Sequence, residues 1–384
     1  MKKETVIELI LYMLMFALAI TYGLTVLKTH YTNSATGSLG MYALYIIACV
    51  ASGVFITGFL FEIGHLLGAK VAGYSIISWN LLFFTFYRDG EKFKFKFSNF
   101  DGLIGETKIA PNYEKKEKPN PLPYLLYGTF FNLAWIIGCI ALFIYFNKLD
   151  SKLDSDFAYA FLTAGIISLA LSVYNIVPAK FDTVNDGYRL KLVVGDKDHN
   201  GFNELLAAQN VGIVVSKKEE SATGEIVAKE SKFSAEANLN KVYSLLENKD
   251  YAEAQKCIDD VIANEETVSR KAMLEARIQN IYIAIMTKTH EECLEYYDKE
   301  VPLFLRKEIS AENTLVAIRT YILMAGLLDG SRSECLVVLA KLNKAYKNTP
   351  SNRKHSELVL FNEALDLVCK AHPKWELEIY KLFE

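Results

Sequence analysis

The sequence predicts a mainly α-helical membrane protein with about four transmembrane helices, a membrane-associated β-hairpin and a soluble C-terminal array of α-hairpins. Of the 384 residues, 51% are hydrophobic and 23% are charged, and the mean hydropathy is +0.14. A soluble chain of this length rarely has a positive mean hydropathy. The long uncharged runs all lie in the first half, whereas the second half is charged and has helical periodicity. A net charge of -3 gives no support for a nucleic-acid partner.

Four stretches are long and apolar enough to cross a bilayer, which takes roughly 20 residues. They lie at about 6–27, 41–67, 122–146 and 157–177. Because Lys2 and Lys3 precede the first stretch, a signal peptide is the competing interpretation. That stretch is longer than the usual apolar region of a signal peptide, and no small-residue cleavage pattern follows it. We therefore expect it to be a retained span.

Basic residues predict the orientation of these spans, since loops rich in Lys and Arg stay in the cytoplasm. Lys2 and Lys3 flank the first span, and nine basic residues follow the second. Those nine are Lys70, Arg88, Lys92, Lys94, Lys96, Lys108, Lys115, Lys116 and Lys118. The loops on the other side hold few basic residues. We expect an integral protein of a bacterial cell membrane with both termini in the cytoplasm.

A β-hairpin is predicted between the second and third spans. Residues 75–87 are rich in aromatic and β-branched side chains, and an Asp89-Gly90 turn follows. Residues 92–97 then alternate strictly between Lys and Phe, which is typical of a strand with one apolar face. The exposed edge of this hairpin could pair with an extended peptide. The alternative is a hairpin that only packs on the helices.

The sequence of the second half predicts a polar linker followed by successive amphipathic helices. We expect an N-terminal transmembrane helix and loop over 1–40, a membrane core over 41–215, a linker over 216–234 and a cytosolic helical domain over 235–384. Residues 243–254 resemble a tetratricopeptide unit, and such arrays bind proteins on a concave face. The alternative is a helical domain that packs on its own membrane half. The six Cys are widely spaced, which predicts neither a disulfide framework nor a Cys-based zinc site.

Two ionisable residues inside the second span are functional candidates, because charged groups within a bilayer are costly. Glu62 and His65 occur in the segment Phe61-Glu62-Ile63-Gly64-His65. A helical H-E-x-x-H motif places two zinc-binding imidazoles one turn apart, with the Glu as general base. Here Phe61 stands where the first His belongs.

Sequence motifs elsewhere in the first half of the chain support a functional role for residues 61–65. Asn175-Ile-Val-Pro ends the fourth span and Asp186-Gly187 follows, while Gly128 and Asn132 lie in the third span. In this order, from about 42 to 194, these elements resemble the site-2 protease family of intramembrane zinc metalloproteases. The resemblance implies that Glu62 is the general base and that His65 and Asp186 bind zinc. It also implies that Asn175 and Asn132 contact the substrate.

Phe61 leaves two functions open. A catalytic zinc site normally has three protein ligands, and phenyl cannot donate to a metal; Asp182, one turn from Asp186, is the alternative third ligand. The first function is a zinc metalloendopeptidase, with impaired catalysis, acting on a membrane-embedded or membrane-proximal peptide. The second is a catalytically silent pseudoprotease without zinc, which binds a membrane peptide and recruits a cytosolic protein through its helical domain. In that case, His65 and Asp186 would pair with each other.

Overall fold

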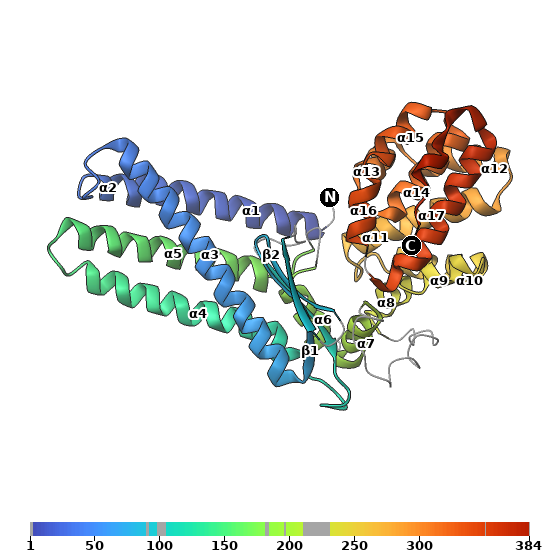
Figure 1. The fold of residues 1–384 in the computed structure, drawn as a ribbon. Helices are drawn as coiled ribbons and strands as arrows, with labels where there is room; N and C mark the ends of the chain where they lie inside the picture. Colours follow the sequence, from blue (N-terminus) through green and yellow to red (C-terminus); the bar gives the residue numbers. More distant parts are fainter. Residues whose placement is uncertain are drawn as a thin grey trace. The chain divides into compact units, whose positions relative to one another are not determined.

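The computed structural model describes residues 3–89, 92–97, 105–180, 184–195, 197–209, 231–349 and 351–383. The chain divides into two compact units, Met1–Leu206 and Ala207–Glu384, which are considered separately (Figure 1). Among the described residues, four helical stretches of the first unit are long and apolar enough to cross a membrane. They are Leu9–Tyr31, Leu39–Ala72, Pro121–Phe146 and Lys152–Ile176. The prediction of a mainly helical chain with four helices of membrane length is therefore confirmed.

The long helices of the first unit follow one another with short connections. Helix α1 (Lys3–Thr21) continues through a π-helical segment, η1 (Tyr22–Leu27), into α2 (Lys28–Tyr31). Helices α3 (Leu39–Ala72), α4 (Pro121–Phe146) and α5 (Lys152–Ile176) form the bundle proper. Each of the three begins at a residue whose side chain accepts a hydrogen bond from the first turn, namely Ser38, Asn120 and Ser151. Two shorter helices, α6 (Asp186–Gly195) and α7 (His199–Gln209), follow.

Glycines on α3 allow it to pack unusually closely on α4. A Cβ atom added at Gly64 would lie 2.5 Å from the carbonyl oxygen of Tyr127, and one at Gly68 would lie 2.2 Å from that of Pro123. Both distances are too short for real contacts, so only glycine fits at either position. Such small-residue contacts are common where helices associate in membranes. This close approach brings the C-terminal half of α3 against the N-terminal half of α4, where the candidate site lies.

The predicted hairpin is part of a larger sheet. Strands β1 (Tyr74–Leu81), β2 (Phe84–Asp89), β3 (Lys92–Phe97) and β4 (Gly105–Pro111) form one antiparallel sheet in the order β3-β2-β1-β4. The hairpin corresponds to β2 and β3, in which Phe95 pairs with Phe86 and Lys96 with Thr85. Phenylalanines and lysines therefore occupy opposite faces, as predicted. The segment 75–87, read as part of one hairpin, is divided by a turn at Leu82, whose φ is 52°.

The second unit is a closed helical domain. Its helices are α8 (Ser234–Leu239), α9 (Val242–Glu247), α10 (Tyr251–Ala263), α11 (Arg270–Thr287), α12 (His290–Glu300), α13 (Leu303–Ala311), α14 (Leu315–Leu323), α15 (Arg332–Leu339), α16 (Leu342–Asn348) and α17 (Ser351–Ala371). An array of repeats has contacts only between neighbours. Here the last long helix returns to the first ones, since Ser356 of α17 donates a hydrogen bond to Glu247 of α9. The linker predicted at 216–234 falls largely on residues outside those described.

Candidate functional site

His65 is held in one orientation between two helices. It lies on α3 and is 4% exposed. Its Nδ1 is 2.7 Å from the carbonyl oxygen of Tyr124 on α4, and a carbonyl can only accept, so Nδ1 carries a proton. Its Nε2 is 3.2 Å from Oδ2 of Asp186. The second contact is also a hydrogen bond when Nε2 carries a proton, which makes the pair an imidazolium–carboxylate ion pair.

Asp186 begins α6 and is fixed from the end of α5. The side chain of Asn175 donates a hydrogen bond of 2.8 Å from Nδ2 to Oδ2 of Asp186. Burial alone would raise the pKa of Asp186, but the imidazole of His65, the charge of Arg189 and the bond from Asn175 together lower it. A Cβ atom at Gly187 would lie 2.1 Å from the carbonyl oxygen of Ile176. Glycine is therefore required at position 187, because any side chain there would prevent α6 from beginning against the end of α5.

Asn185, which the sequence analysis did not identify, fixes the connection between α5 and α6. Its Nδ2 donates to the carbonyl oxygens of Tyr174 and Val177, at 2.8 and 2.7 Å. Its Oδ1 accepts from the backbone nitrogens of Ala179 and Tyr188. An Asn directly before the first acidic residue of a helix is a typical capping signal, so this residue could have been found from the sequence.

Glu62 forms its side-chain hydrogen bond with the sheet. Thr107 of β4 donates a hydrogen bond of 2.5 Å from its hydroxyl to Oε2 of Glu62. Glu62 is 4% exposed, and a Cβ atom at Gly105 would lie 2.8 Å from its Cγ. The hydroxyl of Tyr124 donates to the carbonyl oxygen of Thr107 at 2.9 Å. Thr107 and Tyr124 therefore connect Glu62 to His65, and no sequence pattern marked either of them.

The remaining predicted residues divide into three cases. The ring of Phe61 meets that of His65 edge to face, with 4.5 Å between centroids. Asn132 is fully buried on α4, and neither of its amide atoms has a hydrogen-bond partner in the described part of the chain. Asp182 lies outside the described residues. The structure thus brings Glu62, His65, Asp186 and Asn175 together and places Phe61 among them.

The donor set does not fit a three-ligand catalytic zinc site. His65 Nε2 and Asp186 Oδ2 converge, but the neighbouring ring of Phe61 carries no atom that can bind a metal ion. Glu62 is engaged with Thr107. Within the described ranges, no group of three or more His, Cys, Asp and Glu residues could hold a metal ion. The arrangement holds two helices and α6 in register through an ion pair.

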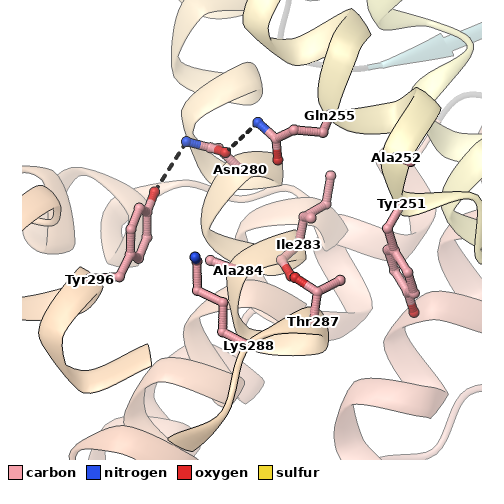
Figure 2. Close-up of a pocket in the computed structure, with 9 residues that line it drawn as sticks. All are labelled: Tyr251, Ala252, Gln255, Asn280, Ile283, Ala284, Thr287, Lys288 and Tyr296. Carbon is pink, nitrogen blue, oxygen red and sulfur yellow. Dashed lines mark hydrogen bonds between the residues drawn. The ribbon is translucent and has the colours of Figure 1, made fainter. Parts of the chain in front are cut away.

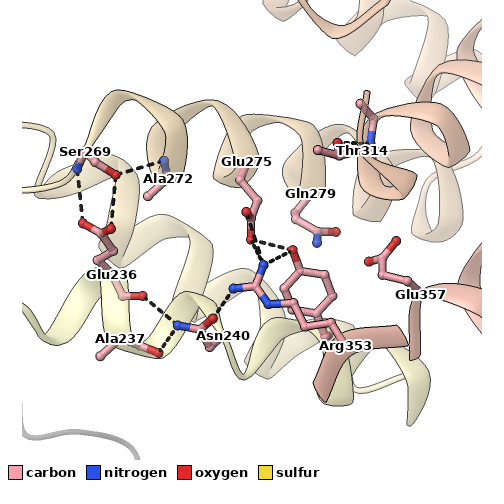
Figure 3. A network of polar contacts seen from close by, with 12 residues as sticks. Glu236, Ala237, Asn240, Ser269, Ala272, Glu275, Gln279, Thr314, Arg353 and Glu357 are labelled. Carbon is pink, nitrogen blue, oxygen red and sulfur yellow. Dashed lines mark hydrogen bonds and ion pairs between the residues drawn. The ribbon is translucent and has the colours of Figure 1, made fainter. Parts of the chain in front are cut away.

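The second unit contains a network of polar contacts around Arg353 of α17, whose guanidinium pairs with Glu275 of α11 at 3.3 Å (Figure 3). A second network, which is buried throughout, lies around Arg319. Arg319 of α14 is fully buried and donates to Glu357 of α17 at 3.3 Å and to Gln279 of α11 at 2.6 Å. Its guanidinium also lies 4.1 Å from the ring centre of Tyr282. Burial raises the pKa of Glu357, and the charge of Arg319 opposes that change. The network joins three helices and exposes no reactive group, so its role is structural.

We expect Arg319→Leu to destabilise the second unit by about 3–5 kcal/mol, because it leaves the carboxylate of Glu357 buried and unpaired. Chemical denaturation of the full chain, followed by tryptophan fluorescence, measures the change. The matched control is Arg277→Leu on α11, where an Arg with a 42% exposed side chain pairs with Glu265 at 4.0 Å. The control should change the stability by less than about 0.5 kcal/mol. Equal effects of the two substitutions would contradict the structural role.

A pocket of about 580 Å³ lies on the same unit between α10, α11 and α12 (Figure 2). A chain of hydrogen bonds runs along it, from Gln255 Nε2 to Asn280 Oδ1 at 2.9 Å and from Asn280 Nδ2 to the hydroxyl of Tyr296 at 3.1 Å. Lys288 and Tyr251 line the same pocket. The pocket therefore offers preordered amide groups, two phenol rings and one basic side chain.

No protein-family model matches this chain, and neither a curated protein nor a solved structure matches it.

Proposed function

We propose that the first unit is a catalytically silent relative of the site-2 proteases, which binds a membrane-embedded or membrane-proximal peptide, while the second unit recruits a cytosolic protein. One observation carries the proposal. Phe61, at the position of the missing ligand, packs on His65, and both ring nitrogens of His65 already have partners. The contacts of His65 and Asp186 then serve binding, because they hold α3, α5 and α6 together without a third metal ligand.

The sheet supports binding of an extended peptide. A peptide can add a strand to the edge of a sheet, with main-chain hydrogen bonds giving affinity. In the described residues, β3 and β4 are the two outer strands. All six residues of β3 are exposed, whereas β4 contacts Glu62 through Thr107. A peptide that runs along β4 would therefore pass the candidate site, and this is the edge we propose for binding.

The pocket of the second unit supports recruitment of a partner. Its side-chain amides are already held in place by the chain from Gln255 to Tyr296. Preordered amides can bond the main chain of an extended segment at a low entropic cost. Lys288 adds one positive charge at this pocket. We therefore propose that the cytosolic partner inserts an extended segment with an acidic residue here.

A photo-crosslinking experiment tests peptide binding in the intact chain. A benzophenone amino acid replaces Lys108 of β4, whose side chain is 49% exposed. The control position is Lys148, which follows α4 at the end opposite to its site-forming N-terminal half. We expect a discrete membrane polypeptide to be crosslinked at 108 but not at 148, and the adduct to persist unchanged with Glu62→Gln. Absence of a specific adduct at 108 would refute peptide binding there.

One observation favours the alternative function, zinc-dependent hydrolysis. Two ligands of a tetrahedral zinc ion lie roughly 3.4 Å apart, and Nε2 of His65 is 3.2 Å from Oδ2 of Asp186. The bond from Nδ1 of His65 to a carbonyl is also typical of a metal-binding His. This function needs a third ligand. It would replace our proposal if the polypeptide crosslinked at 108 were cleaved by the wild-type chain and left intact by Glu62→Gln.

A further inference from the structure

In the described part of the helical bundle, four buried polar side chains have no hydrogen-bond partner. Thr57 of α3, Asn132 of α4 and Ser168 of α5 are fully buried, and Ser172 of α5 is 4% exposed. In the described part of the chain, none of their side-chain oxygen and nitrogen atoms has a partner. An unsatisfied buried polar group costs about 1–3 kcal/mol. Four such groups on three adjacent helices therefore require an explanation.

Helices α3 and α5 place Thr57 opposite Ser168. The helices run in the same direction, because His65 and Asn175, near their C-terminal ends, both contact Asp186. Closer to the middle, a Cβ atom at Gly53 would lie 3.3 Å from Cα of Ala164. Thr57 follows Gly53 by four residues on α3, and Ser168 follows Ala164 by four residues on α5. Four residues are about one helical turn, so Thr57 and Ser168 are also neighbours. A second turn brings Phe61 level with Ser172.

Helix α4 adds Asn132 at the level of Ser172. It runs opposite to α5, and a Cβ atom at Gly165 would lie 3.2 Å from Cβ of Cys139. Counting seven residues toward the candidate site leads from Gly165 to Ser172 on α5 and from Cys139 to Asn132 on α4. Seven residues are about two helical turns, so Ser172 and Asn132 lie on the same helix faces as the contact between Gly165 and Cys139. Thr57, Asn132, Ser168 and Ser172 therefore converge between the three helices, and we call them the interior polar cluster.

The interior polar cluster lies next to the His65–Asp186 pair. Gly128 is one turn from Asn132 toward the site, and a Cβ atom there would lie 2.7 Å from Nε2 of His65. Because glycine has no side chain, α4 places nothing but backbone between Asn132 and the imidazole. On α5, Asn175 follows Ser172 by three residues and bonds Asp186. The cluster thus extends the polar site by about two turns into the bundle.

We propose that the interior polar cluster binds water molecules inside the bundle, within about two helical turns of the His65–Asp186 pair. The chemistry of the ligand follows from the cluster. Its members carry no charge, which argues against an ion, and they are enclosed by three helices, which argues against a large molecule. Three hydroxyls and one amide provide both donors and acceptors, and a buried water typically makes about three hydrogen bonds. The proposal holds whether the bundle binds a peptide or cleaves one.

Thiol reactivity tests the presence of water. The thiolate is the reactive form of cysteine, and it forms only where water or charge stabilises it. Ser168→Cys and Ser172→Cys are nearly isosteric, and Leu169→Cys and Val173→Cys are matched controls at the same depth on the outer face, where the native residues are 46% and 40% exposed. The full chain in lipid vesicles is treated with methyl methanethiosulfonate, and peptide mass spectrometry measures the modification at each position. We expect the serine positions to react at least about tenfold faster than the controls.

A second substitution tests the central role of Asn132. In the Ser172→Cys chain, Asn132→Leu removes the amide and should lower the reaction rate about tenfold, while the Leu169→Cys control stays unchanged. Serine and threonine hydroxyls can instead bond the carbonyl one turn back in their own helix. That arrangement predicts serine positions as unreactive as the controls, and this result would overturn the proposal. A rate unaffected by Asn132→Leu would equally overturn it.

Discussion

Phe61→His is expected to convert a chain that binds little zinc into one that binds about one zinc ion per molecule. The substitution provides a third donor next to His65 and Asp186, whose Nε2 and Oδ2 atoms are already 3.2 Å apart. Three protein ligands with one open position are the usual catalytic zinc set. The phenyl ring meets His65 at a centroid distance of 4.5 Å, so an imidazole there would lie close to the same ion. Elemental analysis of the purified full chain measures the change.

Two matched variants make the zinc measurement decisive. Phe61→Tyr keeps the ring size without adding an imidazole and should bind no more zinc than the wild type. Phe61→His combined with His65→Ala again leaves two ligands and should lose the gain. Wild-type protein that already carries about one zinc per chain would contradict the silent function and favour hydrolysis. A Phe61→His protein that folds but gains no zinc would contradict the assigned ligand position.

The helices could be predicted from the sequence better than the sheet. An uncharged run of about 20 residues is a local property, and all four membrane-length helices followed from it. Strands β2 and β3 were marked by the Asp89-Gly90 turn and the alternation of Lys and Phe. β1 was not recognised as a separate strand because it is buried on both faces over most of Tyr74–Leu81 and has no alternation to detect. β4 carried no signal and is defined by its pairing with β1.

In the candidate site, too, local sequence patterns identified some residues, whereas contacts between distant segments could not be predicted. The spacing of Glu62 and His65 and the order of the later motifs indicated the acidic and imidazole groups, and the structure places His65 and Asp186 in contact. The partner of Nδ1 of His65 is a backbone carbonyl, which no residue type can reveal. Thr107 is 45 positions from Glu62, on an unmarked strand. Contacts that depend on how the sheet meets α3 could not be read from local sequence.

Breaking the His65–Asp186 pair should be among the most destabilising changes in the first unit. Asp186→Ala leaves the imidazole with its Nε2 unpaired and also removes the acceptor of Asn175, so we expect a loss of about 3–5 kcal/mol at pH 7. The double variant His65→Leu with Asp186→Leu should lose less than Asp186→Ala, because it leaves no uncompensated charge. Reversible unfolding of the full chain in mixed micelles measures each value.

The dependence of this loss on pH separates the ion pair from simple packing. The folded chain lowers the pKa of Asp186 below its usual value of 3.8. A carboxyl with a lowered pKa stabilises the folded state above its unfolded pKa, and the stabilisation disappears as the pH falls through the folded value. The difference between wild type and Asp186→Ala should therefore be complete at pH 6 to 7 and shrink progressively below about pH 4. A difference that is the same at both ends of this range would mean that Asp186 acts through its shape, and that the charge on His65 has no part in holding α3, α5 and α6 together.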